Sequence, residues 1–105
     1  MITWIFGQSG QGKTTLAKKI RRHEILLDGD DMRSIWSDLG FSDKDRWENN
    51  IRIANLAKLL DNQGFDIIVA TILPYRKLRG EVKKITKCKF IDLGGESKLN
   101  MPYEK

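Results

Sequence analysis

The sequence is short of cysteine and of long apolar runs, and it has neither internal repeats nor a low-complexity linker. Its one cysteine, Cys88, cannot form an internal disulfide, which fits a reducing compartment. The first ten residues, MITWIFGQSG, lack a basic leader, and no apolar stretch is long enough to cross a bilayer. These absences predict a cytoplasmic protein that is neither exported nor inserted in a membrane.

The length and the charge limit what the chain can do. At 105 residues the sequence predicts one domain over 1–105, and a chain of this size buries roughly two-thirds of its unfolded surface. A hydrophobic content of 40% fits a globular protein and argues against disorder. The net charge of +5 would attract nucleotides, sulfate esters or nucleic acid. A solvated, lysine-rich surface carries the same charge, so charge alone does not identify a partner.

Short apolar segments alternate with helical patterns along the chain. Continuous apolar runs predict buried strands at 2–6, 24–28, 66–72 and 88–93. Apolar periodicity and capping residues predict helices from Lys13 to about Arg22, from Asp31 to Leu39, from the Ser42 cap to about Asn62, and from Pro74 to about Ile85. The tail, 94–105, is expected to form a loop. The alternation predicts an α/β fold with three layers, α/β/α, around a short parallel sheet of about four strands.

A glycine-rich loop follows the first expected strand. The stretch GQSGQGKTT, residues 7–15, meets the pattern G-x-x-x-x-G-K-S/T. Glycines let backbone N–H groups turn toward phosphate oxygens, and a helix that begins at Lys13 adds its positive dipole end. Lys13 is expected to reach the β- and γ-phosphates, and Thr14 to ligate Mg²⁺. An ordinary glycine-rich turn is the alternative, but the strand before the motif and the helix after it favour a P-loop NTPase-like domain that binds ATP with Mg²⁺. The residues expected to hold the nucleotide are Gly7, Gln8, Ser9, Gly10, Gln11, Gly12, Lys13, Thr14 and Thr15.

Carboxylates follow the second expected strand. Asp28 ends that strand, Asp30 follows closely, and Arg33 stands one turn further on. Because ligands of open α/β sheets bind at the carboxyl ends of the strands, Asp28 should lie beside the phosphate loop. Carboxylates there can accept a proton from an acceptor hydroxyl or hold Mg²⁺ through water, and an arginine can pair with an anionic group. A solvated turn with a helix N-cap explains the same residues equally well from spacing alone.

Three further stretches, taken with the phosphate loop, resemble the adenylylsulfate kinase family. They are LLDGDDMR at 26–33, DLGFSDKDRWENNIRIANLAKLL at 38–60, and ILPYR at 72–76. The family pattern reads L-D-G-D-N-x-R, then D-L-G-F-S-x-x-D-R-x-E-N-I-R-R, then I-S-P-Y-R. Four separated motifs in one order make the resemblance specific over roughly residues 2 to 76.

The resemblance implies transfer of the ATP γ-phosphate to the 3′-hydroxyl of adenosine 5′-phosphosulfate. The implied catalytic residues are Lys13, Asp28 and Asp30, with Asp28 as general base or as partner of a Mg²⁺-bound water. The implied acceptor-binding residues are Asp30, Arg33, Phe41, Arg46, Asn49 and Ile72, with Phe41 stacked on adenine. From the residues alone, Phe41 could equally be a core aromatic. Arg46 and Asn49 could belong to the solvated first turns of a helix.

The sequence also departs from the family pattern. Asp31 replaces Asn, Leu73 replaces Ser, and Asn50 and Ile51 stand where Ile and Arg are expected. Only 94–105 follow the fourth expected strand, where the family continues with a basic lid, a strand and a helix. Two other hypotheses therefore stay open: a P-loop kinase for another acceptor, such as a nucleic acid 5′-end or a small alcohol, and a nucleotide-binding module without catalysis. Small-molecule nucleotides are the expected partners, nucleic acid is less favoured, and a second copy of the chain could cover an exposed sheet edge.

Overall fold

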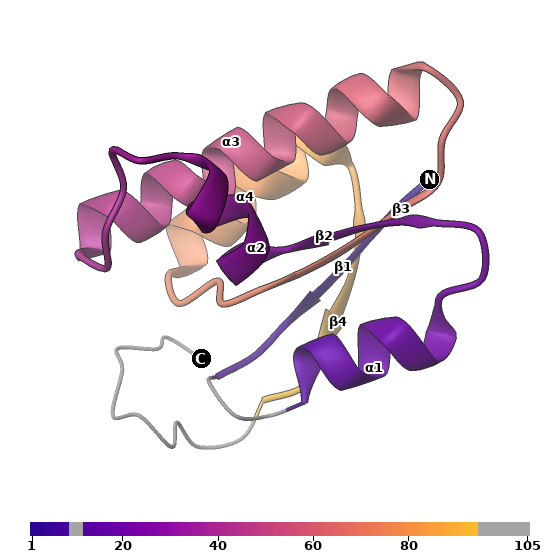
Figure 1. The fold of residues 1–105 in the computed structure, drawn as a ribbon, viewed down its shortest axis with the longest axis horizontal. Helices are drawn as coiled ribbons and strands as arrows, with labels where there is room; N and C mark the ends of the chain where they lie inside the picture. Colours follow the sequence, from indigo (N-terminus) through magenta and orange to yellow (C-terminus); the bar gives the residue numbers. More distant parts are fainter. Residues whose placement is uncertain (9–11, 95–105) are drawn as a thin grey trace.

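Strands and helices alternate in the order that the sequence predicts (Figure 1). The computed structural model describes residues 1–8 and 12–94. The strands are β1 (Ile2–Phe6), β2 (Ile25–Asp28), β3 (Ile67–Thr71) and β4 (Lys89–Asp92). The helices are α1 (Lys13–Ile20), α2 (Gly29–Ile35), α3 (Asp43–Asn62) and α4 (Arg76–Thr86). The expected loop at 94–105 lies, apart from Gly94, outside the described residues.

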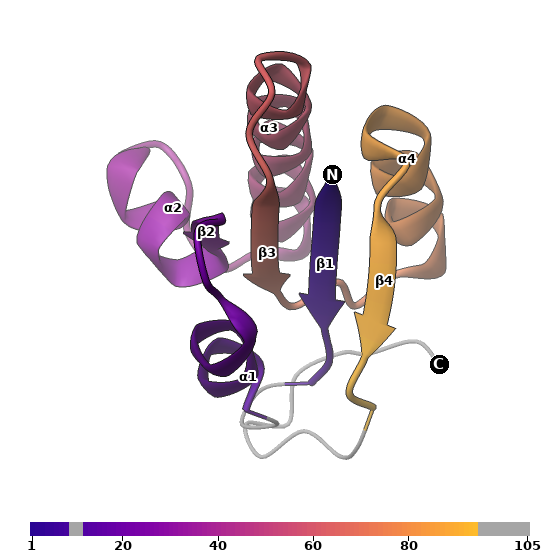
Figure 2. The ribbon, with the colours of Figure 1, turned by 90° about the vertical axis from the view of Figure 1, so that its right-hand side faces the viewer.

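The four strands form one parallel sheet in the order β2-β3-β1-β4. Figure 2 shows α3 and α4 on one face of this sheet and α1 on the other. The predicted three-layer α/β/α architecture around about four parallel strands is therefore confirmed. Because all strands run the same way, their carboxyl ends share one edge, and the segments that follow β1, β2 and β3 meet there.

Alternate residues of the strands pack into two separate hydrophobic cores, one on each face of the sheet. Trp4 and Val69 point into the larger core under α3 and α4, together with Ile53 of α3. Their neighbours Ile5 and Ile68 point into the smaller core under α1. Successive side chains of a strand face opposite sides of the sheet, so strands covered on both sides read as continuous apolar runs. This is why the continuous apolar runs of the sequence located the strands well.

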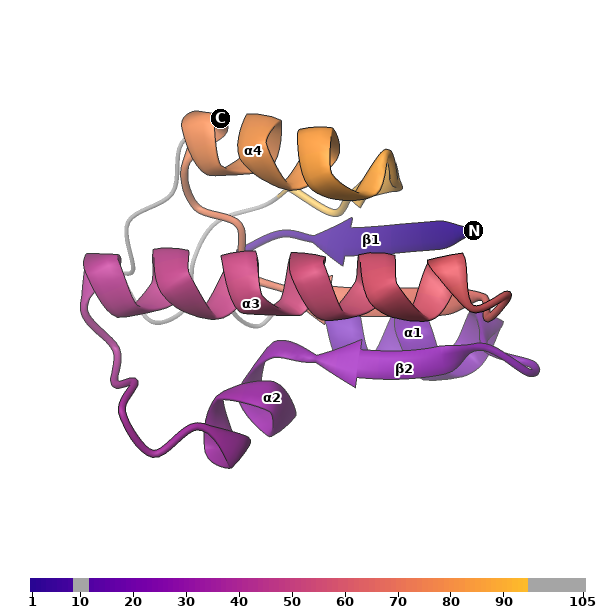
Figure 3. The ribbon, with the colours of Figure 1, turned by 90° about the horizontal axis from the view of Figure 1, so that it is seen from above.

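Helix α2 differs from the prediction, because it spans Gly29–Ile35 and not 31–39. The carboxylate of Asp28 accepts hydrogen bonds from the backbone N–H groups of Asp30 and Asp31, which lets the helix begin directly after β2. The helix stops before Trp36, whose backbone is extended. Figure 3 shows α2 just beyond the carboxyl end of β2.

Helix α3 runs from the side of the carboxyl ends of the strands back to the amino end of β3 (Figure 3). The hydroxyl of Ser42 accepts the N–H of Asp45 at 3.1 Å, which is the predicted cap. The helix ends at Asn62, ahead of Gly64. Over residues 1–8 and 12–94, no helix combines the length and apolar character that crossing a bilayer requires.

Candidate active site

A cleft of about 490 Å³ lies at the carboxyl edge of the sheet, where the phosphate loop, α2 and α3 meet. Among the described residues, its lining comprises Gly12, Lys13, Thr14, Thr15, Asp28, Gly29, Asp30, Arg33, Phe41, Arg46, Asn49, Asn50, Ala70, Thr71 and Ile72. Every acceptor-binding residue that the resemblance implies is in this set. The structure thus brings the phosphate loop and the predicted acceptor residues to one cleft.

The phosphate loop leads into α1 through a left-handed residue. Gly12 has φ of +81°, a conformation that glycine adopts without strain, and its carbonyl accepts the first helical hydrogen bond from Leu16. Gly7 and Gln8, which precede the turn, are buried. The predicted nucleotide-binding residues Ser9, Gly10 and Gln11 lie outside the described residues.

Lys13 is held at the start of α1 with its ammonium group inside the site. The Nζ atom donates to the carbonyl oxygen of Gln8 at 3.0 Å. Partial burial lowers the pKa of Lys13, although the nearby carboxylates of Asp30 and Asp28 act in the opposite direction. A cation in this environment would be stabilised by a bound anion, and a nucleotide phosphate has the required charge.

Asp28 joins the two sides of the cleft. Its Oδ2 atom accepts a hydrogen bond from Thr14 Oγ1 at 2.6 Å, and its Oδ1 atom accepts from the backbone N–H groups of Asp30 and Asp31 at 3.0 and 3.3 Å. The N-cap interpretation of this segment is therefore right about the geometry. The same carboxylate also touches the phosphate loop, so capping and a role in the site do not exclude each other.

The side-chain oxygens of Thr14 and Asp28 are suitable ligands for Mg²⁺. This ion prefers oxygen ligands and usually takes one or two from the protein, with phosphate oxygens and water completing its shell. Within the described ranges, no group of three or more His, Cys, Asp or Glu side chains forms a metal cage. A single hydroxyl–carboxylate pair beside a phosphate loop is the arrangement expected for an ion that arrives with a nucleotide.

The start of α2 packs tightly against the end of β3. A Cβ atom added to Gly29 would lie 3.1 Å from the Thr71 methyl group, so a glycine permits this close approach. The Thr71 hydroxyl in turn accepts a hydrogen bond from the indole N–H of Trp4 at 2.9 Å. Sequence reasoning missed Thr71, although a polar residue at the last position of an apolar strand was the available signal.

Arg33 and Phe41 lie together on the acceptor side. Arg33 donates to the carboxylate of Asp30 at 2.6 Å, and its guanidinium carbon lies 4.1 Å from the centre of the Phe41 ring. Phe41 is 66% exposed, so the interpretation of this residue as a core aromatic is wrong. An exposed ring beside two charged groups provides a flat surface and anion-pairing capacity at the same place.

Two adjacent asparagines on α3 are buried at the cleft. Asn49 is 4% exposed, accepts the indole N–H of Trp36 at 2.7 Å and donates to the carbonyl of Gly29 at 3.2 Å. A solvated helix face is therefore the wrong description of Asn49, and Arg46 is half-buried beside the cleft. Asn50, which sequence reasoning treated only as a departure from a pattern, is buried as well. Asp31 is exposed and is absent from the described lining.

Comparison with known proteins identifies a family and several curated relatives of the chain. The family profile described as "Adenylylsulphate kinase" matches residues 1–104. The adenylyl-sulfate kinase of Pseudomonas aeruginosa is 44% identical over 86 residues, which cover 74% of this chain and 44% of that protein. The chain spans about half the length of the curated relatives it matches.

Solved structures resemble the fold closely. The APS kinase CysC of Mycobacterium tuberculosis, determined in complex with AMPPNP and APS, has a TM-score of 0.77 and 32% identity. That match covers 87% of this chain and 59% of the other. A hexameric APS kinase from Thiobacillus denitrificans has a TM-score of 0.68 and 32% identity, over 88% of this chain and 21% of the other.

Proposed function

The chain belongs to the adenylylsulfate kinase family, and we propose that it transfers the γ-phosphate of ATP to the 3′-hydroxyl of adenosine 5′-phosphosulfate. One observation carries the proposal: the phosphate loop and the acceptor residues line a single cleft. The Thr14–Asp28 hydrogen bond joins the two halves of that cleft directly. A donor phosphate and an acceptor hydroxyl held there would be close together, which is the main requirement of phosphoryl transfer.

In this proposal Lys13 neutralises the β- and γ-phosphates of ATP, and the amide groups of the loop orient them. Thr14 and Asp28 would hold Mg²⁺, Asp28 through a water molecule. When bound, the ion would neutralise part of the negative charge of the phosphates. The contacts of Asp28 favour a role in positioning the Mg²⁺-bound water over a role as general base, because its two oxygens already accept hydrogen bonds from three donors.

Asp30 is then the carboxylate best placed to take the proton of the acceptor hydroxyl. Its side chain is 84% exposed at the cleft, and its contact with Arg33 holds one of its oxygens. Arg33 and Arg46 provide cationic partners for the phosphosulfate group. Phe41 offers an exposed ring face on which the acceptor adenine can stack.

The test is ADP release from MgATP with three acceptors: adenosine 5′-phosphosulfate, a 5′-hydroxyl oligonucleotide, and none. We expect turnover with the first alone. Asp28→Asn should lower kcat by about a hundredfold or more, because the loop hydroxyl loses its charged partner. Asp31→Asn is the matched control, since Asp31 is exposed and outside the described lining, and it should stay near the wild-type rate.

Other outcomes would select the competing hypotheses. Turnover that requires the oligonucleotide would identify a kinase for nucleic acid ends. Calorimetric binding of ATP without turnover on any acceptor would identify a nucleotide-binding module. Either result would contradict the proposed reaction.

Self-association is a further part of the proposal, which the hexameric relative from Thiobacillus denitrificans supports. Light scattering coupled to gel filtration would measure the mass of the particle in solution. A mass equal to that of one chain at micromolar concentration would contradict it.

A further inference from the structure

Asn50 makes two hydrogen bonds in the wall of the cleft, one within its own helix and one to the segment after β3. Its side-chain amide Nδ2 donates to the carbonyl of Arg46, one turn earlier in α3, and to the carbonyl of Ile72, both at 3.0 Å. Ile72 directly follows β3 and lines the cleft. The amide therefore ties the segment that leaves β3 to the body of α3.

The two acceptor carbonyls fix the orientation of the amide, because only the NH₂ end can donate to both. The opposite atom, Oδ1, is buried and has no hydrogen-bond partner among the described residues. The family pattern that the sequence resembles has isoleucine at this position. A buried amide with one unpartnered end stabilises the fold less than an apolar side chain would, so its presence calls for an explanation beyond packing.

Asn49 provides the comparison on the same helix turn. It donates to the carbonyl of Gly29, the residue that directly follows β2. The two neighbouring asparagines thus hold the segments after β2 and β3 respectively, and both segments line the cleft. Asn49 fits the family pattern, whereas Asn50 departs from it.

We infer that Asn50 is a positioning residue that fixes the acceptor side of the cleft by tethering the Ile72 carbonyl to α3. Ile72 and the following Leu73 and Pro74 form a short connection between β3 and α4. With the tether, the Ile72 side chain stays where it borders the acceptor; without it, Ile72 loses its hydrogen bond to α3, while the carbonyl of Leu73 is still held by Arg79 Nε at 2.8 Å. The kinetic part of the inference rests on the proposed function, whereas the tether itself does not.

The test uses Asn50→Ile, which removes both the tether and the unpartnered oxygen and places in the site the residue of the family pattern. We expect an unchanged or higher melting temperature together with a roughly tenfold higher KM for adenosine 5′-phosphosulfate, the effect of one lost hydrogen bond. The KM for ATP should stay the same and kcat should change little. Asn55→Ala, an exposed position on the same helix, is the control and should change none of these values.

Hydrogen exchange separates the tether from the reaction. In Asn50→Ile, the amides of Ile72, Leu73 and Tyr75 should exchange several-fold faster than in the wild type, while those of α3 should not. Unchanged exchange there would overturn the inference, whatever the kinetics. Faster exchange with an unchanged acceptor KM would also overturn it, because the tether would then not position the acceptor. If the wild type has no acceptor turnover, the proposed function fails, and the exchange measurement alone decides whether the tether exists.

Discussion

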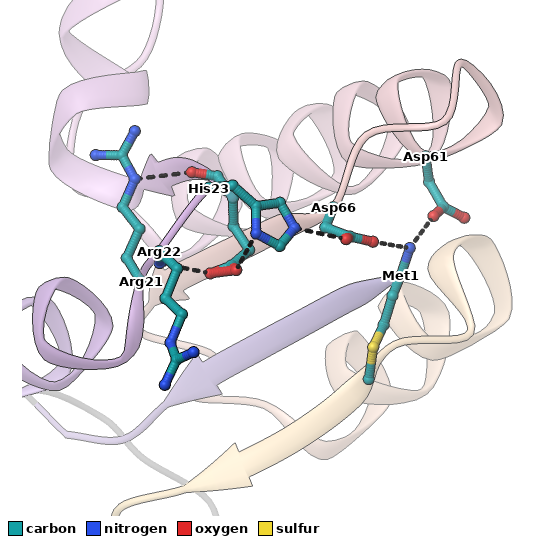
Figure 4. Close-up of polar contacts among 7 residues, drawn as sticks. Met1, Arg21, Arg22, His23, Asp61 and Asp66 are labelled. Carbon is teal, nitrogen blue, oxygen red and sulfur yellow. Dashed lines mark hydrogen bonds and ion pairs between the residues drawn. The ribbon is translucent and has the colours of Figure 1, made fainter.

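At its carboxyl edge the sheet meets Thr14, Asp28, Asn49 and Asn50, which are half or fully buried, whereas at its amino edge it meets Met1 and His23, whose side chains are 71% and 72% exposed. Figure 4 shows the second arrangement. There Asp66 accepts from His23 Nε2 at 2.9 Å and from the Met1 amine at 3.1 Å, and the same amine contacts Asp61. The hydrogen bond to Asp66, with the nearby charge of Glu24, raises the pKa of His23 above its ordinary value.

The difference between the two ends is one of burial. The His23 side chain is 72% exposed, so its ion pair is screened by water and adds little to stability. At the carboxyl edge, Asn49 and Asn50 are withdrawn from water and form hydrogen bonds within the protein, which fixes their positions. Polar residues at the two ends of the same strands therefore differ in their roles. At the carboxyl end they form a site, and at the amino end they belong to the solvent-exposed surface.

The largest effect is expected from Lys13→Ala. A backbone loop without the ammonium charge cannot neutralise the γ-phosphate, so kcat should fall about a hundred- to a thousandfold. ATP affinity, measured by calorimetry, should fall as well. Lys18→Ala removes a lysine from the exposed side of the same helix and should leave both values near wild type. Equal losses in the two variants would mean that general charge, and not the position of Lys13, holds the phosphates.

Two glycine-to-alanine variants, one at the carboxyl edge and one on α4, should change the free energy of unfolding in opposite directions. In Gly29→Ala the new Cβ meets the Thr71 methyl group at 3.1 Å, and this crowding should lower the free energy of unfolding by about 1 kcal/mol. Gly80 lies on the exposed side of α4, where the new Cβ of Gly80→Ala has no atom within 4 Å, and the higher helix propensity of alanine should raise stability by about 1 kcal/mol. Urea denaturation measures both values. A stabilised Gly29→Ala would show that the end of β3 is not packed as described.

The smallest effect is expected at His23. A raised pKa means that the pair stabilises the fold fully below the unfolded pKa of histidine, and that this contribution disappears as pH rises through the folded pKa. The pKa of Asp66 is lowered by the same contacts, so protonation of Asp66 removes the contribution in acid. The melting temperature of His23→Gln should therefore fall slightly below that of the wild type between about pH 4 and about pH 6.5, and match it in alkali. A difference in melting temperature that persists unchanged into alkali would contradict the assignment of this contribution to the His23–Asp66 pair.

The sequence was sufficient for the features that depend on local patterns. Continuous apolar runs located the strands, and Ser42 and Gly64 located the ends of α3, because these signals lie within a few residues of one another. The start of α2 was predicted two residues late, because the Asp28 carboxylate was not assigned as the group that caps it.

The buried amides could not be predicted from local sequence. Asn49 and Asn50 are polar residues near the start of a helix, where solvent exposure is the usual expectation. Their partners, Gly29 and Ile72, are 20 and 22 residues away, and only the packing of α3 against the sheet brings them together. The composition of the acceptor side was available from the family resemblance, but its hydrogen bonds required the fold.

The most direct test of the central claim follows the phosphate itself. The wild-type chain is incubated with Mg²⁺, adenosine 5′-phosphosulfate and ATP labelled on its γ-phosphate, and the products are separated by chromatography. We predict that the label moves to the acceptor and is released again by a phosphatase specific for 3′-phosphates. Label that stays in ATP, or that appears only as inorganic phosphate, would contradict the claim that this cleft joins a phosphate donor to an acceptor hydroxyl.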